Sequence, residues 1–157
     1  MANIIKIKRD VELLIKQYLM DELPQAASSS SPDSLESTSD GGYTWLTGMT
    51  EDEFKLPAIV VICREATLDI LSYNWDCQVD VEIIHHYADT TRAEHNNKSA
   101  EIRDKLIAES TDICEILKEN ELGIYPLLYT PTNSVREVRD KKYVTTQSLT
   151  LNCNYLG

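Results

Sequence analysis

The sequence predicts an α+β fold in a single domain, with a twisted, mostly antiparallel sheet packed against an N-terminal helix and a long amphipathic helix. Three observations support this. Residues 76–87 alternate between apolar and polar side chains, as in a strand with one face on a core. Directly after them, Thr91 and Glu94 have the spacing of a capping box that opens a helix. Residues 56–63 form an apolar, β-branched run typical of a buried central strand.

The bulk composition fits one domain that spans residues 1–157. Of the 157 residues, 42% are hydrophobic and 26% charged, which suits one core of ordinary size. No apolar run approaches the roughly 18–20 residues that a membrane span needs. The first residues mix charges with apolar side chains, so we expect no signal peptide and a mature, cytosolic start.

The first predicted elements are a helix and a long loop. Apolar residues recur at helical spacing between residues 10 and 22, which predicts an N-terminal helix. Residues 25–42 are rich in serine and acid and almost free of apolar side chains, so we expect a long loop that is mobile in a free subunit. Tyr43, Trp45 and Leu46 return to an apolar pattern, interpreted as the far arm of an extended hairpin whose tip is that loop.

The middle of the chain is predicted to hold a hairpin and a broken helix. Residues 67–71 are interpreted as a short strand and residues 72–74 as the turn into the long strand. The helix that begins near Arg92 carries its apolar residues on one stripe and is expected to break at residues 110–112.

Two last strands are predicted at residues 124–129 and 143–155. The charged segment 134–142 between them is interpreted as a loop or a hairpin tip.

The four cysteines are dispersed, without a C-x-x-C pair, and each lies in a predicted strand or helix. Structural zinc sites need closely paired ligands, and disulfides are typical of secreted proteins. We therefore expect free, buried thiols that behave as small apolar residues. The residues are Cys63, Cys77, Cys114 and Cys153.

The net charge of −11 is unevenly distributed. Residues 17–54 contain eight acids and no lysine or arginine. A protein that grips nucleic acid by its phosphates needs a basic face, so this charge argues against such a protein. An acidic wall suits instead a channel that DNA passes without binding, to which Asp76, Asp80 and Glu82 of the long strand would add.

The histidines are the candidate for a metal site. His85 and His86 are adjacent in a strand and point to opposite faces, so both cannot bind one ion without distortion. His85, Asp89 and His95 stay open as the residues of a small metal-dependent hydrolase. In the structural interpretation, His85 lies on the apolar face and His95 forms a hydrogen bond near the corner between strand and helix.

No motif of nucleophilic catalysis or phosphate binding occurs: there is no G-x-S-x-G, no G-x-x-x-x-G-K-[ST] and no G-x-G-x-x-G. We therefore expect a protein that is not an enzyme, with no catalytic residues and no cofactor. Tryptophan is enriched at the cores of interfaces, and a mobile loop can become ordered against a partner. The candidate interface residues are Ser28, Asp33, Asp40, Tyr43, Trp45 and Trp75.

Residues 56–106 carry a series of short motifs. They are Leu-Pro-x-Ile-Val-Val from Leu56 to Val61, Asn74-Trp75, the alternating strand, Ala88-Asp89-Thr90-Thr91, and His95 within an amphipathic helix. This series resembles the tail terminator (tail completion, or neck) proteins of tailed bacteriophages. The likeness covers about a third of the chain directly, and no catalytic residue is part of it.

The resemblance implies a virion structural protein of the phage tail and neck. Six copies of an α+β subunit would form a ring that caps the head-proximal end of the tail tube and offers a joining face to the head connector. The implied partners are further copies of the chain, the tail tube protein and the head connector or neck protein, with the sheath protein as a further candidate. DNA would pass through the lumen without specific binding, and no membrane is involved. Another neck ring, such as a head-completion protein or connector stopper, is the alternative within this class.

Overall fold

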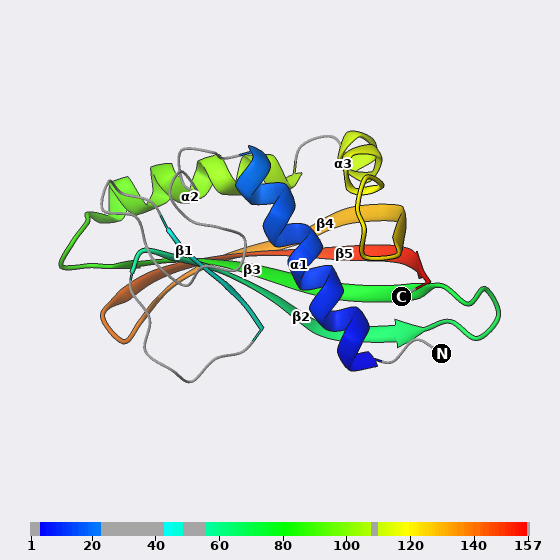
Figure 1. Cartoon of the computed structure of the whole chain (residues 1–157). Helices are drawn as coiled ribbons and strands as arrows, with labels where there is room; N and C mark the ends of the chain where they lie inside the picture. Colours follow the sequence, from blue (N-terminus) through cyan, green and yellow to red (C-terminus); the bar gives the residue numbers. More distant parts are fainter. Residues whose placement is uncertain (1–3, 23–42, 49–55, 108–109, 157) are drawn as a thin grey trace.

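The computed structural model describes residues 4–22, 43–48, 56–107 and 110–156, which form one mixed sheet with helices on one face (Figure 1). This arrangement confirms the predicted α+β class. The strand order is β1-β2-β3-β5-β4, with β1 and β2 parallel and all other neighbours antiparallel. The elements are α1 (Ile4–Glu22), β1 (Thr44–Thr47), β2 (Ala58–Leu68), β3 (Trp75–His86), α2 (Arg92–Ile107), α3 (Ser110–Leu117), β4 (Ile124–Arg139) and β5 (Lys142–Tyr155).

Helix α1 confirms the predicted N-terminal helix but begins six residues earlier than residue 10. The reason is that Ile7 continues the helical spacing of Val11, Leu14 and Ile15 and is completely buried, so packing extends the helix towards its N-terminus. In place of the second predicted helix the structure describes two helices, α2 to Ile107 and α3 from Ser110, and the expected break was at residues 110–112.

Strands β2 and β3 form the predicted hairpin, although β2 runs to Leu68 and the turn occupies residues 69–74. The turn is closed by hydrogen bonds from the Asp69 amide to the Asn74 carbonyl (2.8 Å) and from the Tyr73 amide to the Asp69 carbonyl (2.7 Å). Residues 58–63 are buried on both faces, as expected for a central strand. In β3 the predicted alternation holds over the first half, and both faces are buried from Val81 to His85.

Strand β1 corrects the interpretation of residues 43–46 as the far arm of a hairpin. It pairs in parallel with β2, from Thr44 opposite Ala58 to Thr47 opposite Val61. Among the described residues, the element that precedes β1 is α1, and the strand that pairs with β1 follows it in the chain and runs in the same direction. The serine-rich segment, residues 25–42, lies outside the described residues.

Strands β4 and β5 confirm a hairpin tip within residues 134–142, the second of the two predicted alternatives, but the turn is much shorter than that segment. The two strands pair continuously from Ile124 opposite Tyr155 to Arg139 opposite Lys142, and only Asp140 and Lys141 form the turn. Both turn residues have positive φ (48° and 62°), as two-residue hairpin turns require. The charged side chains fit a strand here because β4 is an edge strand with most of its outer residues in water.

The main apolar core lies between the sheet and the helices and takes side chains from α1, α2, α3 and all five strands. A smaller cluster lies on the opposite face of the sheet and consists of Leu46, Val60, Ile62, Ile84 and Val144. The four cysteines are free and buried, as predicted. Among the described helices, none combines the length and apolar character that crossing a bilayer requires.

Candidate functional site

Two histidines form a buried polar chain where β3, β5 and α2 meet. His85 Nδ1 lies 2.7 Å from His95 Nδ1, His85 Nε2 lies 3.2 Å from the Tyr43 hydroxyl, and His95 Nε2 lies 2.8 Å from Thr145 Oγ1. All four side chains are at least 95% buried. The structure thus confirms that His85 lies on the core face and that His95 forms hydrogen bonds beside the corner between strand and helix.

Both rings are held in their neutral form. Burial, together with the neighbouring His95 and Lys98, lowers the pKa of His85 to about 4. Burial also lowers the pKa of His95, with Arg136 adding to the effect. In the neutral pair one Nδ1 donates and the other accepts, and each Nε2 then pairs with a hydroxyl, so every ring nitrogen is satisfied. This arrangement is that of a structural network.

The structure does not gather the three residues of the metal-site hypothesis. Asp89 lies in the exposed turn after β3, where its amide donates to the His86 carbonyl. Within the part of the chain that the structure describes, no group of three or more histidine, cysteine, aspartate or glutamate side chains could hold a metal ion. The ring nitrogens that a metal would need are occupied by hydrogen bonds inside the core.

The predicted interface residues fall into two groups. Ser28, Asp33 and Asp40 lie outside the described residues. Tyr43, Trp45 and Trp75 are 5%, 0% and 5% exposed and belong to the main core of the single chain. Their positions are those of packing residues, and the large exposed apolar side chains lie elsewhere.

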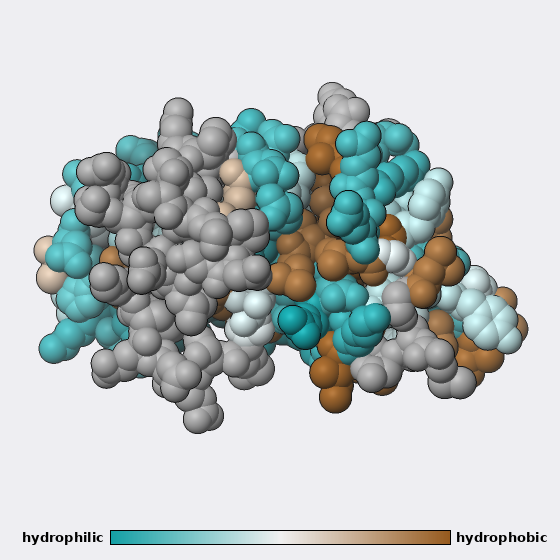
Figure 2. All heavy atoms as spheres, viewed as in Figure 1, coloured by the Kyte–Doolittle hydropathy of each residue, from teal (hydrophilic) through white to brown (hydrophobic). Residues whose placement is uncertain are grey.

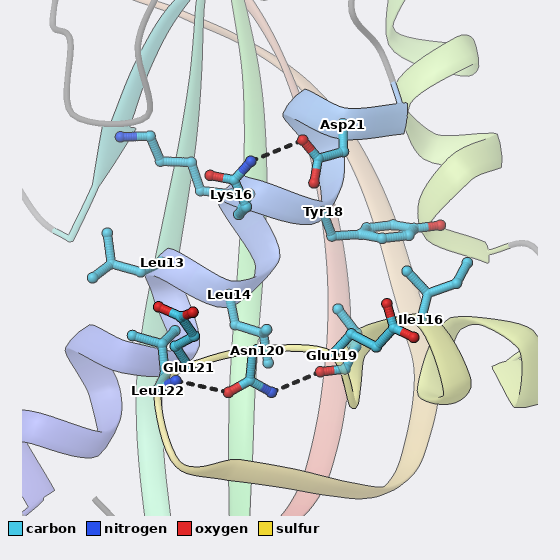
Figure 3. Close-up of a pocket in the computed structure, with 12 residues that line it drawn as sticks. Leu13, Leu14, Lys16, Tyr18, Asp21, Ile116, Glu119, Asn120, Glu121 and Leu122 are labelled. Carbon is cyan, nitrogen blue, oxygen red and sulfur yellow. Dashed lines mark hydrogen bonds between the residues drawn. The ribbon is translucent and has the colours of Figure 1, made fainter.

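A groove of about 410 Å³ lies between α1, α3 and the segment that joins α3 to β4 (Figure 3). Leu14 and Tyr18 form one wall, and Ile116 and Leu122 contribute apolar surface opposite them. Asn120 closes one end: its amide nitrogen donates to two backbone carbonyls, and its oxygen accepts from the Leu122 amide at 2.9 Å. The polar groups of the Asn120 side chain are therefore used to fix the loop.

The face of the sheet opposite the helices carries a network of ion pairs. Arg64 pairs with Asp80 and lies 3.5 Å from Glu82, and Arg139 lies 3.1 Å from the second oxygen of Glu82. Asp76 accepts a hydrogen bond from Asn152. The strand acids that we expected to add to an acidic wall are therefore largely compensated by neighbouring arginines and amides.

An exposed apolar tip is formed by the turn between β2 and β3. We call residues 65–76 the apolar hairpin. Leu68, Ile70, Leu71 and Tyr73 are 40%, 76%, 94% and 71% exposed. Figure 2 shows apolar surface at this end of the molecule. The only charged residues of the segment are three exposed acids: Glu65, Asp69 and Asp76.

The turn between β4 and β5 lies at the opposite end of the sheet and has the opposite charge. We call residues 135–143 the basic hairpin. It carries four bases and two acids, a net charge of +2 within a chain of net charge −11. Arg139 is paired with Glu82 and Glu137, but none of the other three bases forms an ion pair with a described residue. Those bases are Arg136, Lys141 and Lys142.

A hollow of about 390 Å³ adjoins the basic hairpin. Arg92, Arg136 and one acid, Glu137, stand among its lining residues, together with the apolar or aromatic side chains of Val138 and Tyr143. Sequence reasoning placed a turn in both segments but singled out neither tip as a candidate surface. A signal for the first was present: Ile70 and Leu71 are apolar residues in a predicted turn, where polar residues are usual.

In comparisons with known proteins, no family model matches the chain, and no curated protein is significantly similar to it.

Proposed function

We propose that this chain is the subunit of a tail terminator ring, a structural protein that caps the head-proximal end of a phage tail tube and joins it to the head connector. The observation that carries the proposal is the apolar hairpin. Leu71 is 94% exposed and Ile70 76% exposed in a turn closed by backbone hydrogen bonds, so the apolar side chains are held in water by a rigid element. Contiguous exposed apolar surface of this kind marks association sites.

The remaining support comes from the sequence resemblance and from the fold. The motif residues build the central part of the sheet and the start of α2. Ile59 to Val61 lie in β2, and Trp75 opens β3. Thr91 Oγ1 accepts a hydrogen bond from the Glu94 amide at the start of α2. The histidine of the motif, His95, fixes α2 to β3 and β5. The motif therefore corresponds to residues that build the subunit, as is expected for a structural protein without an active site.

The test is assembly with the tail tube. Native mass spectrometry of the concentrated chain, and cryo-electron microscopy of tubes to which it has been added, should show rings of six at one end of each tube. Tube protein that polymerises in its presence should give shorter tubes than in its absence. A strict monomer on an assembled tail contradicts the proposal. Capture of a portal-side adaptor in place of the tube would instead indicate the other neck ring, the head-completion or stopper protein.

A further inference from the structure

The two hairpin tips are complementary in charge and in character. The apolar hairpin presents aliphatic side chains flanked by three acids and no base. The basic hairpin presents Val135 and Val138, 47% and 56% exposed, beside three bases that are unpaired among the described residues. An apolar centre with charges at its rim is the usual composition of a protein interface, and opposite rims favour the encounter.

The hollow beside the basic hairpin has the features needed to receive the apolar tip. Val138 and Tyr143 supply apolar lining for side chains such as Ile70 and Leu71. Arg92 and Arg136 supply positive charge for Asp69. Asp69 directly precedes Ile70 and Leu71 in the chain and is exposed as they are. Asp69 also accepts a hydrogen bond from the Leu71 amide at 3.0 Å, so carboxylate and apolar side chains are presented by one rigid turn.

The two tips cannot meet within one copy. They lie at opposite ends of β3, whose length of 12 residues corresponds to roughly 40 Å, and Figure 1 shows the two turns at opposite ends of the sheet. We propose that copies of this chain join head to tail, with the apolar hairpin of one copy seated in the hollow beside the basic hairpin of the next. This inference rests on the proposed ring and names the surfaces that close it. A contact between two different patches repeats from copy to copy, as a ring requires.

The contact is expected to be weak in free solution. Four side chains of one turn offer less than the roughly 800 Å² per partner of a standard stable interface. Assembly should therefore need high protein concentration or a tail tube that aligns the copies, since neighbouring sites on a template raise the effective concentration.

The decisive experiment uses two full-length variants, each altered at one tip. L71D places a charge in the apolar hairpin, and R136E reverses a charge at the hollow; both residues are exposed, so the fold should be kept, as circular dichroism verifies. Matched controls are I116D in α3 and R9E in α1, two exposed residues that belong neither to the two hairpins nor to the lining of the hollow. Sedimentation velocity over a concentration series, with and without tail tubes, gives the size distribution.

Each single variant should associate at least tenfold more weakly than the wild type, whereas both controls assemble normally. An equimolar mixture of L71D and R136E should give dimers that do not grow, because the mixture offers one intact pair of tips per dimer. The double variant D69R/R136E should restore assembly, because the charges at the two tips are exchanged and again opposite. If both single variants assemble like the wild type, the inference is overturned while the proposed ring stands. A wild type that stays monomeric at every concentration and on tails overturns the proposed function as well.

Discussion

The face of the sheet that carries the helices differs from the opposite face in how its polar groups are satisfied. On the helical face, buried polar side chains form hydrogen bonds: His85 pairs with His95, Glu12 accepts a hydrogen bond from the Cys63 amide at 2.8 Å, and Tyr129 donates one to the Leu106 carbonyl. On the opposite face, Glu82 is 8% exposed but lies between two arginines. These buried groups on the helical face are satisfied by hydrogen bonds, whereas the buried carboxylate on the opposite face is satisfied by ion pairs with arginine.

The difference matters because strand β3 contributes to both faces through adjacent residues. Ile83 belongs to the main core with the helices, whereas Ile84 belongs to the cluster of five buried residues on the other side. The two residues have the same side chain and the same strand, so their substitution compares the two faces directly. The predictions below use such comparisons, from the largest effect to the smallest.

I83A should lower the free energy of unfolding by about 4 kcal/mol and I84A by about 2 kcal/mol, near the two ends of the range for such truncations. Ile83 is completely buried under the helices, while Ile84 packs in a small cluster whose neighbours can relax. Urea unfolding at neutral pH measures both values. Equal losses would show that the second cluster is as tightly packed as the main core.

Acid should destabilise the helical face through His85. Its pKa is about 4 in the folded chain and 6.5 in the unfolded chain, so the unfolded chain binds more protons between these values. Stability is therefore complete above pH 6.5 and falls as the pH drops towards 4, by about 3 kcal/mol at most. The measurement is the unfolding midpoint in urea across this range.

The control for this pH effect is the adjacent residue on the other face. H85Q should reduce the slope between pH 4 and 6.5 even if it lowers stability overall, because one of the two buried histidines whose pKa is lowered is gone and only His95 remains. H86Q should keep the slope of the wild type, since the His86 side chain is half-buried and lies outside the buried chain. An unchanged slope in H85Q would mean that another group controls the acid response.

E12A should cost about 2 kcal/mol at neutral pH, because it leaves the buried Cys63 amide without an acceptor. The amide lies next to the irregularity in β2 between Cys63 and Glu65, where the register against β3 shifts. E12Q retains an acceptor oxygen and should cost clearly less. Similar losses in the two variants would assign the effect to charge in place of the hydrogen bond.

The smallest effect is expected on the opposite face. R139A should cost only about 0.5 kcal/mol, because its side chain is partly exposed and Arg64 still compensates Glu82. The loss should fall further in 1 M salt, where ion pairs at the surface are screened. R9A on the exposed side of α1 serves as a control for the loss of one positive charge. A loss above 2 kcal/mol would show that Glu82 depends on Arg139 alone.

Much of the fold could be predicted from the sequence, because periodicity reports burial directly. The long strand, the buried run at residues 58–63 and the stripe on α2 and α3 were all visible as spacing. The parallel pairing of β1 was not, because a strand of four residues has no pattern that encodes the direction of its partner. The extended β4 was missed because an exposed edge strand with many charges has the composition of a loop.

The surfaces were harder to predict than the core. Tyr43, Trp45 and Trp75 were candidates for an interface because of their residue type, yet the core uses them for packing. The hairpin tips depend on which residues the turns leave in water, and that follows from strand register. Likewise, the distance between His85 and His95 follows from how α2 returns over the sheet, which spacing along the chain does not give.

The position of β5 has a consequence for synthesis on the ribosome. β5 lies between β3 and β4, although it follows both in the sequence. Until β5 leaves the exit tunnel, β3 keeps one open edge, and β4 lacks the strand with which it pairs in the structure. The nascent chain thus exposes unpaired strands until the last of them emerges, and the sheet closes in one late step in which β5 pairs on both sides.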